Sequence, residues 1–358
     1  MSKCAELANL IGNINAGGGG VNRNVVINGA MNLAQRATSA TGVGGSSGYF
    51  TLDRFKILPS TTSGRVTMSR DSSAPSGFAN SLKLAVTTAD TSVAAGEYFI
   101  ISHKIEGQNL QGFAKGTPDA KPFAVSFYVK GNASATYACE LFDSNGRQAS
   151  KLFSVTTDWT RVELTFDPDT SGAFPDDNTM GLELNFWLHA GSNFSSGTLN
   201  QTFASNDNTK RASGISSLFD STSRTFFITG VQLEVGQNPT SFEHEPFERT
   251  LSKCQRYFQK LQNGRLLSIG NGNNQSIGGT DLAVDLRASA TVTYSTSTWA
   301  AYTGMSGSQV AYTASNLSSI ALNAKFRYNF NNTDDTKVYW SDLGTGTDQT
   351  VVSIDAEL

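Results

Sequence analysis

The chain has 358 residues, of which 16% are charged, and its formal net charge at pH 7 is -3. This near-neutral balance excludes a protein that binds nucleic acid through its overall electrostatic field, because such binding needs clustered lysines and arginines. A hydrophobic share of 38% with 22 phenylalanines excludes intrinsic disorder over most of the length. No apolar run approaches the ~20 residues of a membrane span, so we expect no membrane insertion.

The first predicted element is a short amphipathic helix at the N-terminus. Its apolar residues form one narrow stripe at helical spacing from Cys4, namely Leu7, Leu10, Ile11 and Ile14. Gly17–Gly20 then end the helix and act as a flexible link. Helices of ~12–15 residues are marginally stable in water. We therefore expect residues 1–24 to be an anchor that docks on a partner or pairs with copies of itself, the alternative being a frayed tail.

Residues 25–245 alternate apolar and polar side chains in one short stretch after another. Phe123–Lys130, Arg161–Phe166 and Leu182–His189 each have this two-residue period, which is typical of antiparallel strands with one buried face. Asp143–Gly146, with the sequence Asp-Ser-Asn-Gly, is a strong hairpin signal. Strands joined by turns, without helices of useful length, predict a jelly-roll β-sandwich.

A single amphipathic helix is predicted near Phe247–Gln262, within a connecting segment of residues 246–263. Pro246 suits its first turn, and Asn263 with Gly264 suits its end. Its apolar side repeats every three or four residues and consists of Phe247, Leu251, Cys254, Phe258 and Leu261. We expect this side to form the seam of a homotrimer around a rotation axis. The alternative is a helix that packs on its own sandwich.

Residues 264–358 return to short apolar stretches, which predicts a smaller C-terminal β-sandwich. Four large aromatic residues on this loop-rich sequence offer a second supply of recognition side chains: Trp299, Tyr302, Tyr312 and Trp340. The predicted fold class is therefore all-β, with one connecting helix and a short N-terminal helical anchor.

Three stretches of the chain are more specific than strand periodicity. They are NRNVVINGAMNLAQR (22–36) with YFTLDRF (49–55), KIEGQNL (104–110) with KPFAVSFYVK (121–130), and TGVQLEVG (229–236) leading into FEH (242–244) and CQRYF (254–258). Together with the ending IDAEL (354–358), they resemble bacteriophage tail-fibre and related virion structural proteins. Separately, DWTRVELTF (158–166) is similar to strands of carbohydrate-binding modules with a jelly-roll fold.

This resemblance, over roughly residues 22–260, implies a phage structural protein of the tail or of the capsid surface. It would be made in the host cytoplasm and carried in the virion. Its implied partners are other phage structural proteins, a tail adaptor or the capsid, reached through the N-terminus.

Motifs of enzymes and metal centres are missing from the sequence. The three histidines occupy unrelated contexts, and no phosphate loop, nucleophile elbow or dinucleotide fingerprint occurs. The three cysteines lie too far apart for metal-ligand spacing or a disulfide framework. We therefore predict a non-enzymatic protein without metal or cofactor. A structural calcium ion remains an alternative in one acidic loop, which contains Asp167, Asp169, Asp176 and Asp177.

Glycan recognition without catalysis needs an aromatic platform flanked by amides, carboxylates or imidazole, because sugars present C–H faces and hydroxyls. The outward side of Leu182–His189 supplies this mixture. With one neighbouring tyrosine, the predicted glycan site is Tyr128, Glu183, Asn185, Trp187 and His189. A competing interpretation places Trp187 in the sandwich interior or at a subunit contact.

The sequence thus predicts a tail fibre or receptor-binding protein that recognises host surface polysaccharide through several weakly binding copies. One alternative is a capsid decoration protein of the phage head, in which the same sandwich contacts no receptor. The other is a polysaccharide-cleaving enzyme, which would need two facing carboxylates at a defined separation.

Overall fold

The computed structural model describes residues 2–15, 22–261, 264–270, 275–294, 298–303, 309–313, 317–322, 325–331, 338–343 and 351–358. The chain divides into two compact units, Met1–Thr250 and Leu251–Leu358. The boundary falls inside helix α3 (Phe247–Gln255), within the predicted connecting segment of residues 246–263. Among the described residues, every helix is too short or too polar to cross a membrane.

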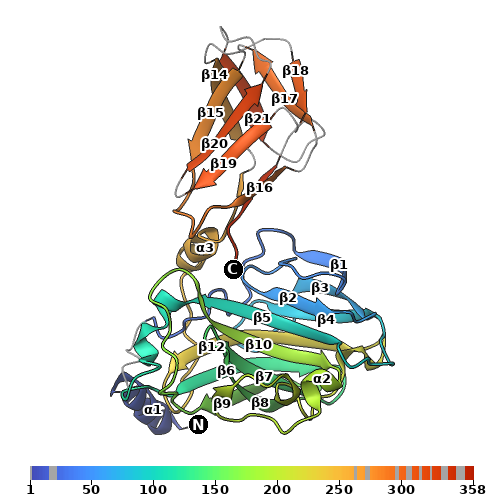
Figure 1. Cartoon of the computed structure of the whole chain (residues 1–358), viewed down its shortest axis with the longest axis vertical. Helices are drawn as coiled ribbons and strands as arrows, with labels where there is room; N and C mark the ends of the chain where they lie inside the picture. The colour runs from blue at the N-terminus through green and yellow to red at the C-terminus, as the bar shows by residue number, and fades with distance from the viewer. Residues whose placement is uncertain are drawn as a thin grey trace. The chain divides into compact units, whose positions relative to one another are not determined.

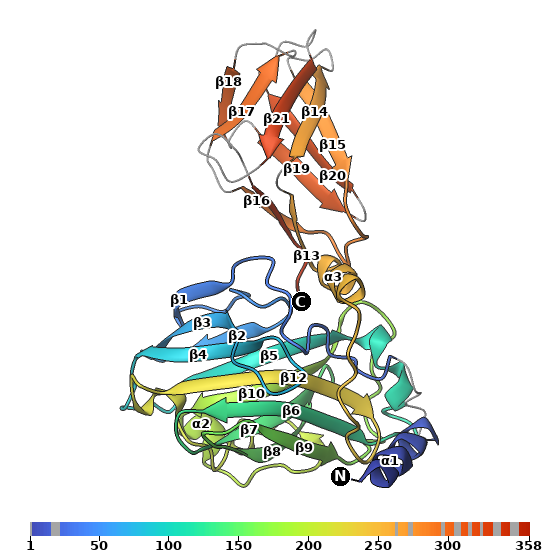
Figure 2. The same ribbon diagram turned by 180° about the vertical axis from the view of Figure 1, so that it is seen from behind.

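The first unit is built on two six-stranded antiparallel sheets, and Figures 1 and 2 label their strands except β11. In spatial order the first sheet contains β1 (Ser39–Val43), β3 (Arg65–Asp71), β4 (Ser81–Thr88), β12 (Thr225–Val235), β6 (Phe123–Gly131) and β9 (Thr160–Phe166). The second contains β11 (Ala204–Ser205), β8 (Arg147–Val155), β7 (Ala135–Asp143), β10 (Met180–Ala190), β5 (Tyr98–Glu106) and β2 (Lys56–Ser60). The predicted jelly-roll β-sandwich is confirmed.

The core of the first unit lies between these sheets. Phe123, Val125, Phe127 and Val129 of β6 all belong to it, as the alternating sequence predicts. The Phe127 ring packs edge-on against Phe186 of β10, with ring centroids 5.0 Å apart. Burial of each such side chain contributes about 1.5–3 kcal/mol to the free energy of unfolding, so the alternating strands account for much of the driving force.

The outer face of the second sheet is also covered. Trp187 packs in a second apolar cluster with Ile100, Ala138 and Ala212, and Phe194 lies against it. Phe194 belongs to the short helix α2 (Ser192–Ser195) and Ala212 follows the 3₁₀ turn η3 (Asn208–Lys210). The segment after β10 therefore folds back over the sheet, and both faces of β10 are buried.

The second unit contains two further antiparallel sheets. The three-stranded sheet has the order β13 (Phe258–Leu261), β22 (Val352–Asp355) and β16 (Thr291–Tyr294). The seven-stranded sheet has the order β18 (Gln309–Thr313), β17 (Thr298–Thr303), β21 (Val338–Leu343), β14 (Gly264–Gly270), β15 (Gln275–Asp281), β20 (Lys325–Asn331) and β19 (Leu317–Leu322). The described core residues of the second unit are Leu282, Leu286, Phe326, Tyr328, Val352, Ile354 and Ala356.

The predicted helix over Phe247–Gln262 is wrong in its second half. Helix α3 ends at Gln255, and Phe258–Leu261 form strand β13, which pairs with β22 near the C-terminus. The Gln259 amide fixes this strand further, since it accepts the backbone N–H of Ala283 and donates to the carbonyl of Val284. Long-range pairing of this kind overrides a local helical period.

The predicted trimer seam is corrected accordingly. Phe258 and Leu261 lie on a strand, whereas Phe247, Leu251 and Cys254 lie on α3. Cys254 is buried and Phe247 is exposed, so these residues do not form one uniform helical surface.

The N-terminal helix α1 spans Lys3–Asn15, where the apolar stripe predicts a helix. Leu7 and Ile11 are 57% and 50% exposed. The side chains of Leu10 and Ile14, and Gly17–Gly20, lie outside the described residues. The role of this helix as an anchor stays a prediction.

Candidate functional site

The structure does not bring the predicted glycan-site residues together on an open surface. Asn185, Trp187 and His189 are fully buried under the segment that follows β10. Glu183 is half-buried and pairs with Lys104 at 3.2 Å. Tyr128 lies on β6 of the other sheet. The expectation of one outward platform on β10 is therefore corrected, because the alternation within a strand cannot reveal a cover built from the segment that follows it.

Trp187 and Asn185 belong instead to an internal polar network around Glu140. The Glu140 carboxylate accepts Trp187 Nε1–H at 2.8 Å and Asn185 Nδ2–H at 3.1 Å. Arg211 donates to both of its oxygens, at 2.7 and 2.8 Å, and also lies 4.8 Å from the Trp187 ring centroid. A buried carboxylate needs such partners to offset the loss of hydration. The network therefore holds the loop cover in place.

An aromatic patch, defined as Phe78, Tyr128, Phe242 and His244, lies on the outer face of the first sheet. The Phe78 ring centroid is 5.4 Å from that of Tyr128, 5.0 Å from Phe242 and 5.1 Å from His244. Phe242 and His244 are 4.9 Å apart. The three larger rings are half-buried and His244 is exposed. Rings in contact at a surface provide a broad apolar area bordered by one polar side chain.

Gly230 explains how two of these rings reach the sheet. It sits in a bulge of β12, where the pairing with β6 shifts between Thr229 and Gln232, and its φ is 62°. A Cβ atom at this position would lie 2.8 Å from Phe78 Cζ and 2.9 Å from Tyr128 Cδ2. The missing side chain therefore leaves the space that both rings fill.

Further aromatic and cationic residues continue along the same face. Phe227 points outward from β12, with Trp159 at 6.1 Å between ring centroids and Lys83 Nζ 5.3 Å from the Phe227 ring. Arg161 lies opposite Tyr128 in the β6–β9 register. It donates to the carbonyl of Thr240. Lys83 and Arg161 also form ion pairs with Asp71 and Glu163, so the face around the patch combines apolar rings with paired charges.

A polar latch, formed by residues 22–24 and 232–243, places Phe242 and His244 on this face. The Glu234 carboxylate accepts the backbone N–H of Thr240 at 2.6 Å and its hydroxyl at 2.8 Å. Glu243 accepts the backbone N–H groups of Asn22 at 2.7 Å and Asn24 at 2.9 Å. Much of the TGVQLEVG–FEH motif thus serves to fix the chain across β12.

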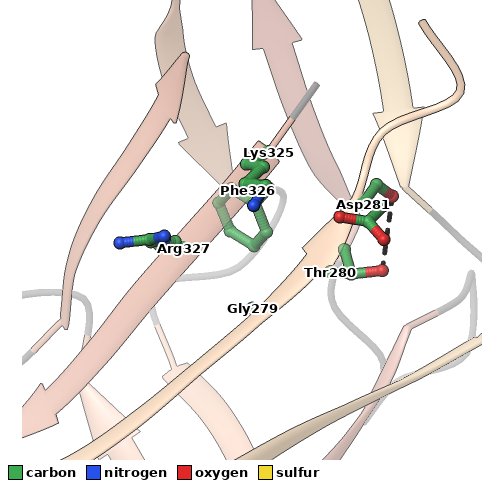
Figure 3. Close-up of a pocket in the computed structure, with 6 residues that line it drawn as sticks. All are labelled: Gly279, Thr280, Asp281, Lys325, Phe326 and Arg327. Atoms are coloured by element: carbon green, nitrogen blue, oxygen red, sulfur yellow. Dashed lines mark hydrogen bonds between the residues drawn. The ribbon is translucent and has the colours of Figure 1, made fainter. Parts of the chain in front are cut away.

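The second unit has a shallow depression of about 250 Å³ between β15 and β20, shown in Figure 3. Asp281 pairs with Lys325 and Gly279 with Arg327 in the strand register, so the bare glycine leaves space beside the arginine. The three charged side chains are exposed, and the aromatic residue of the lining, Phe326, is buried. This mixed-charge surface lacks an accessible ring, and it is a weaker glycan platform than the aromatic patch.

No family model and no curated protein matches the chain. Among solved structures, an enzymatically active domain of tailspike protein 4 from bacteriophage CBA120 is similar, with 15% identity and a TM-score of 0.31 over 59% of this chain and 21% of that chain. The module TmCBM61, solved with β-1,4-galactotriose, has 10% identity and a TM-score of 0.30 over 60% of this chain and 99% of that chain.

A family 11 carbohydrate-binding module from Clostridium thermocellum has 12% identity and a TM-score of 0.27, over 58% of this chain and 99% of that chain. The chain thus spans about a fifth of the tailspike domain and nearly all of each module. These values are too low to carry an argument about activity or ligand.

Of the aromatic patch, Tyr128 is a candidate site residue predicted from the sequence, and Phe78, Phe242 and His244 are not. Phe78 and Phe242 stand outside the strands, so no two-residue period marks them. The available signal was Gly230 within a strand of otherwise apolar and β-branched residues, since such a glycine indicates a bulge or a close approach.

Proposed function

We propose that the chain is a non-enzymatic phage virion structural protein that recognises host surface glycans, in the manner of a tail fibre or receptor-binding protein. The observation that supports this most directly is the aromatic patch, because its half-buried rings lie on an outer sheet face and contact one another. Sugar C–H faces would stack on Phe78 and Tyr128, while His244 would exchange hydrogen bonds with hydroxyls.

A single patch of this size gives weak binding, so the mechanism depends on several copies held together. We propose a homotrimer as the unit of attachment. The exposed Phe247 on α3 supports self-association, because large apolar side chains at the surface favour contacts. Sedimentation of the full chain at micromolar concentration tests this, and a monomer there refutes the trimer.

Attachment to the particle would use α1. Its exposed Leu7 and Ile11 offer an apolar surface to a tail adaptor or to the capsid. Labelled protein at the tail in images of the virion fits a fibre. Many copies spread over the head would instead establish the alternative, a capsid decoration protein.

The glycan proposal is tested with the full chain and purified envelope polysaccharide of the host. Tyr128→Ala and His244→Ala should each weaken binding at least tenfold, because each removes part of the aromatic patch. Tyr49→Ala is the matched control, since Tyr49 is half-buried but lies outside the patch. Folded patch variants that bind as well as the wild type would refute the proposal. Shortening of the polysaccharide during incubation would instead establish an enzyme.

A further inference from the structure

A second group of chemically interesting side chains lies away from the aromatic patch, where β4, β5 and β10 end close together. Asp90 follows β4, Glu97 precedes β5, and His189 is near the end of β10. One potential ligand atom from each residue lies within 4.8 Å of the other two. The residues are 5%, 7% and 0% exposed, respectively, so this is an interior cluster.

The charges of this cluster are not balanced by protein groups. Among the described residues, no lysine or arginine forms an ion pair with Asp90 or Glu97, and the basic group that faces them is His189, 3.5 Å from Glu97. Two carboxylates with one imidazole carry a net negative charge even when the imidazole is protonated. Buried charges of this kind are normally paired or bound to a metal ion.

The His189 ring is oriented toward the two carboxylates. Its Nδ1 lies 2.8 Å from Ser217 Oγ. Its Nε2 faces Glu97, is buried, and has no hydrogen-bond partner in the described structure. When Nδ1 donates its proton to Ser217, the Nε2 lone pair points at the carboxylates, an arrangement that a cation would stabilise.

The carboxylates also accept hydrogen bonds from neighbouring groups, as metal ligands usually do. Asp90 accepts the hydroxyl of Thr62 at 2.7 Å and the backbone N–H of Ser63 at 2.8 Å. Glu97 accepts the backbone N–H of Ala94 at 2.9 Å. These hydrogen bonds orient both carboxylates toward the cluster.

We propose that Asp90, Glu97 and His189 supply three ligands to one divalent ion of the zinc class. Imidazole nitrogen with carboxylate oxygen is a ligand set that Zn²⁺ accepts, whereas Ca²⁺ prefers oxygen alone. Zinc bonds of ~2.0–2.2 Å require the three ligand atoms to move closer together. The connection at residues 91–95, which is exposed, can make this adjustment.

Ser217, His189 and Glu97 also have the composition of a hydrolase triad. Ser217 Oγ, however, accepts the backbone N–H of Phe219 and caps the 3₁₀ turn η4 (Leu218–Asp220). His189 has no exposed surface, so a substrate could not reach the pair. A metal ion can be bound at a site closed to solvent, whereas a catalytic nucleophile must be accessible to its substrate.

The test uses the full chain without an affinity tag, stripped with a chelator and then titrated with Zn²⁺ alone. We expect one Zn²⁺ per chain and a higher Tm on binding. Glu97→Gln and Asp90→Asn should each weaken the affinity roughly 100-fold or more, and Ser217→Ala roughly 10–100-fold. Glu183→Gln is the matched control on β10, and Cys4→Ser excludes the exposed thiol as the ligand.

No uptake by the wild type, equal uptake by Glu97→Gln, or stabilisation by Ca²⁺ but not Zn²⁺ would each overturn the proposal. Should the variants fail to fold, X-ray absorption of the zinc-loaded wild type decides the question. A first shell with one imidazole nitrogen and carboxylate oxygens supports the site, and a shell that contains sulfur or lacks imidazole refutes it.

Discussion

Gly230 offers the sharpest test of how the aromatic patch is built. An alanine at this position would hold φ near 62°, a left-handed conformation that costs a residue with a Cβ about 1–2 kcal/mol. Its Cβ would also lie 2.8 Å from Phe78 Cζ and 2.9 Å from Tyr128 Cδ2. Overpacking of this kind adds about 1–3 kcal/mol unless the rings move.

Gly146 provides the matched control, because its φ is 72° and a Cβ there meets nothing within 4 Å. Urea unfolding should show that Gly146→Ala loses about 1–2 kcal/mol from backbone strain alone. Gly230→Ala should lose about 1–3 kcal/mol more, or keep that stability and lose glycan binding because the rings are displaced. Equal losses in the two variants, together with unchanged binding by Gly230→Ala, would refute this account of the patch.

Two other predictions concern buried charge. Glu140→Ala should lower the free energy of unfolding by about 3–5 kcal/mol, since it leaves Arg211 without its carboxylate partner. The control Glu163→Ala removes an ion pair at the surface and should lower it by less than about 1 kcal/mol. Equal losses of the two variants in urea unfolding would contradict the argument. Burial and the Arg54 guanidinium lower the pKa of His103 from 6.5 to about 3, so below pH 6.5 the unfolded chain binds a proton that the folded chain does not. The contribution of His103 to the free energy of unfolding should therefore fall by up to about 1.4 kcal/mol per pH unit, roughly 1.6 kcal/mol between pH 6.5 and 5. His103→Gln should flatten this slope relative to the exposed-site control His244→Gln, and parallel pH profiles of the two would show that His103 is not its source.

The inner half of the sandwich could be predicted from sequence because it follows a local rule. On β6 and β10 every second side chain enters the core, and this rule holds whatever the rest of the chain does. The outer half depends on other segments. The two-residue period of β10 places Trp187 on the outer face of the sheet, but Phe194 and Ala212 cover it. The alternation of residues along β10 does not predict this cover.

The same distinction between local and long-range contacts explains why the other features were not predicted. The helical period continues through Phe258 although the backbone there pairs with residues at the C-terminus. In the aromatic patch Phe78 contacts Phe242, and in the interior cluster Asp90 lies near His189, although both pairs are far apart in the sequence. Contacts between residues so far apart in the sequence follow from the topology, and no spacing in the sequence encodes them.

The polar latch has a mechanical consequence. It joins Asn22 and Asn24, which precede the first strand, to Glu243, which follows the last strand of the first unit, by hydrogen bonds to one carboxylate. Tension between the N-terminal helix and the chain beyond α3 would therefore load these bonds before it reached the strands. Under tension, these hydrogen bonds of the polar latch would break and re-form while the sandwich kept its fold.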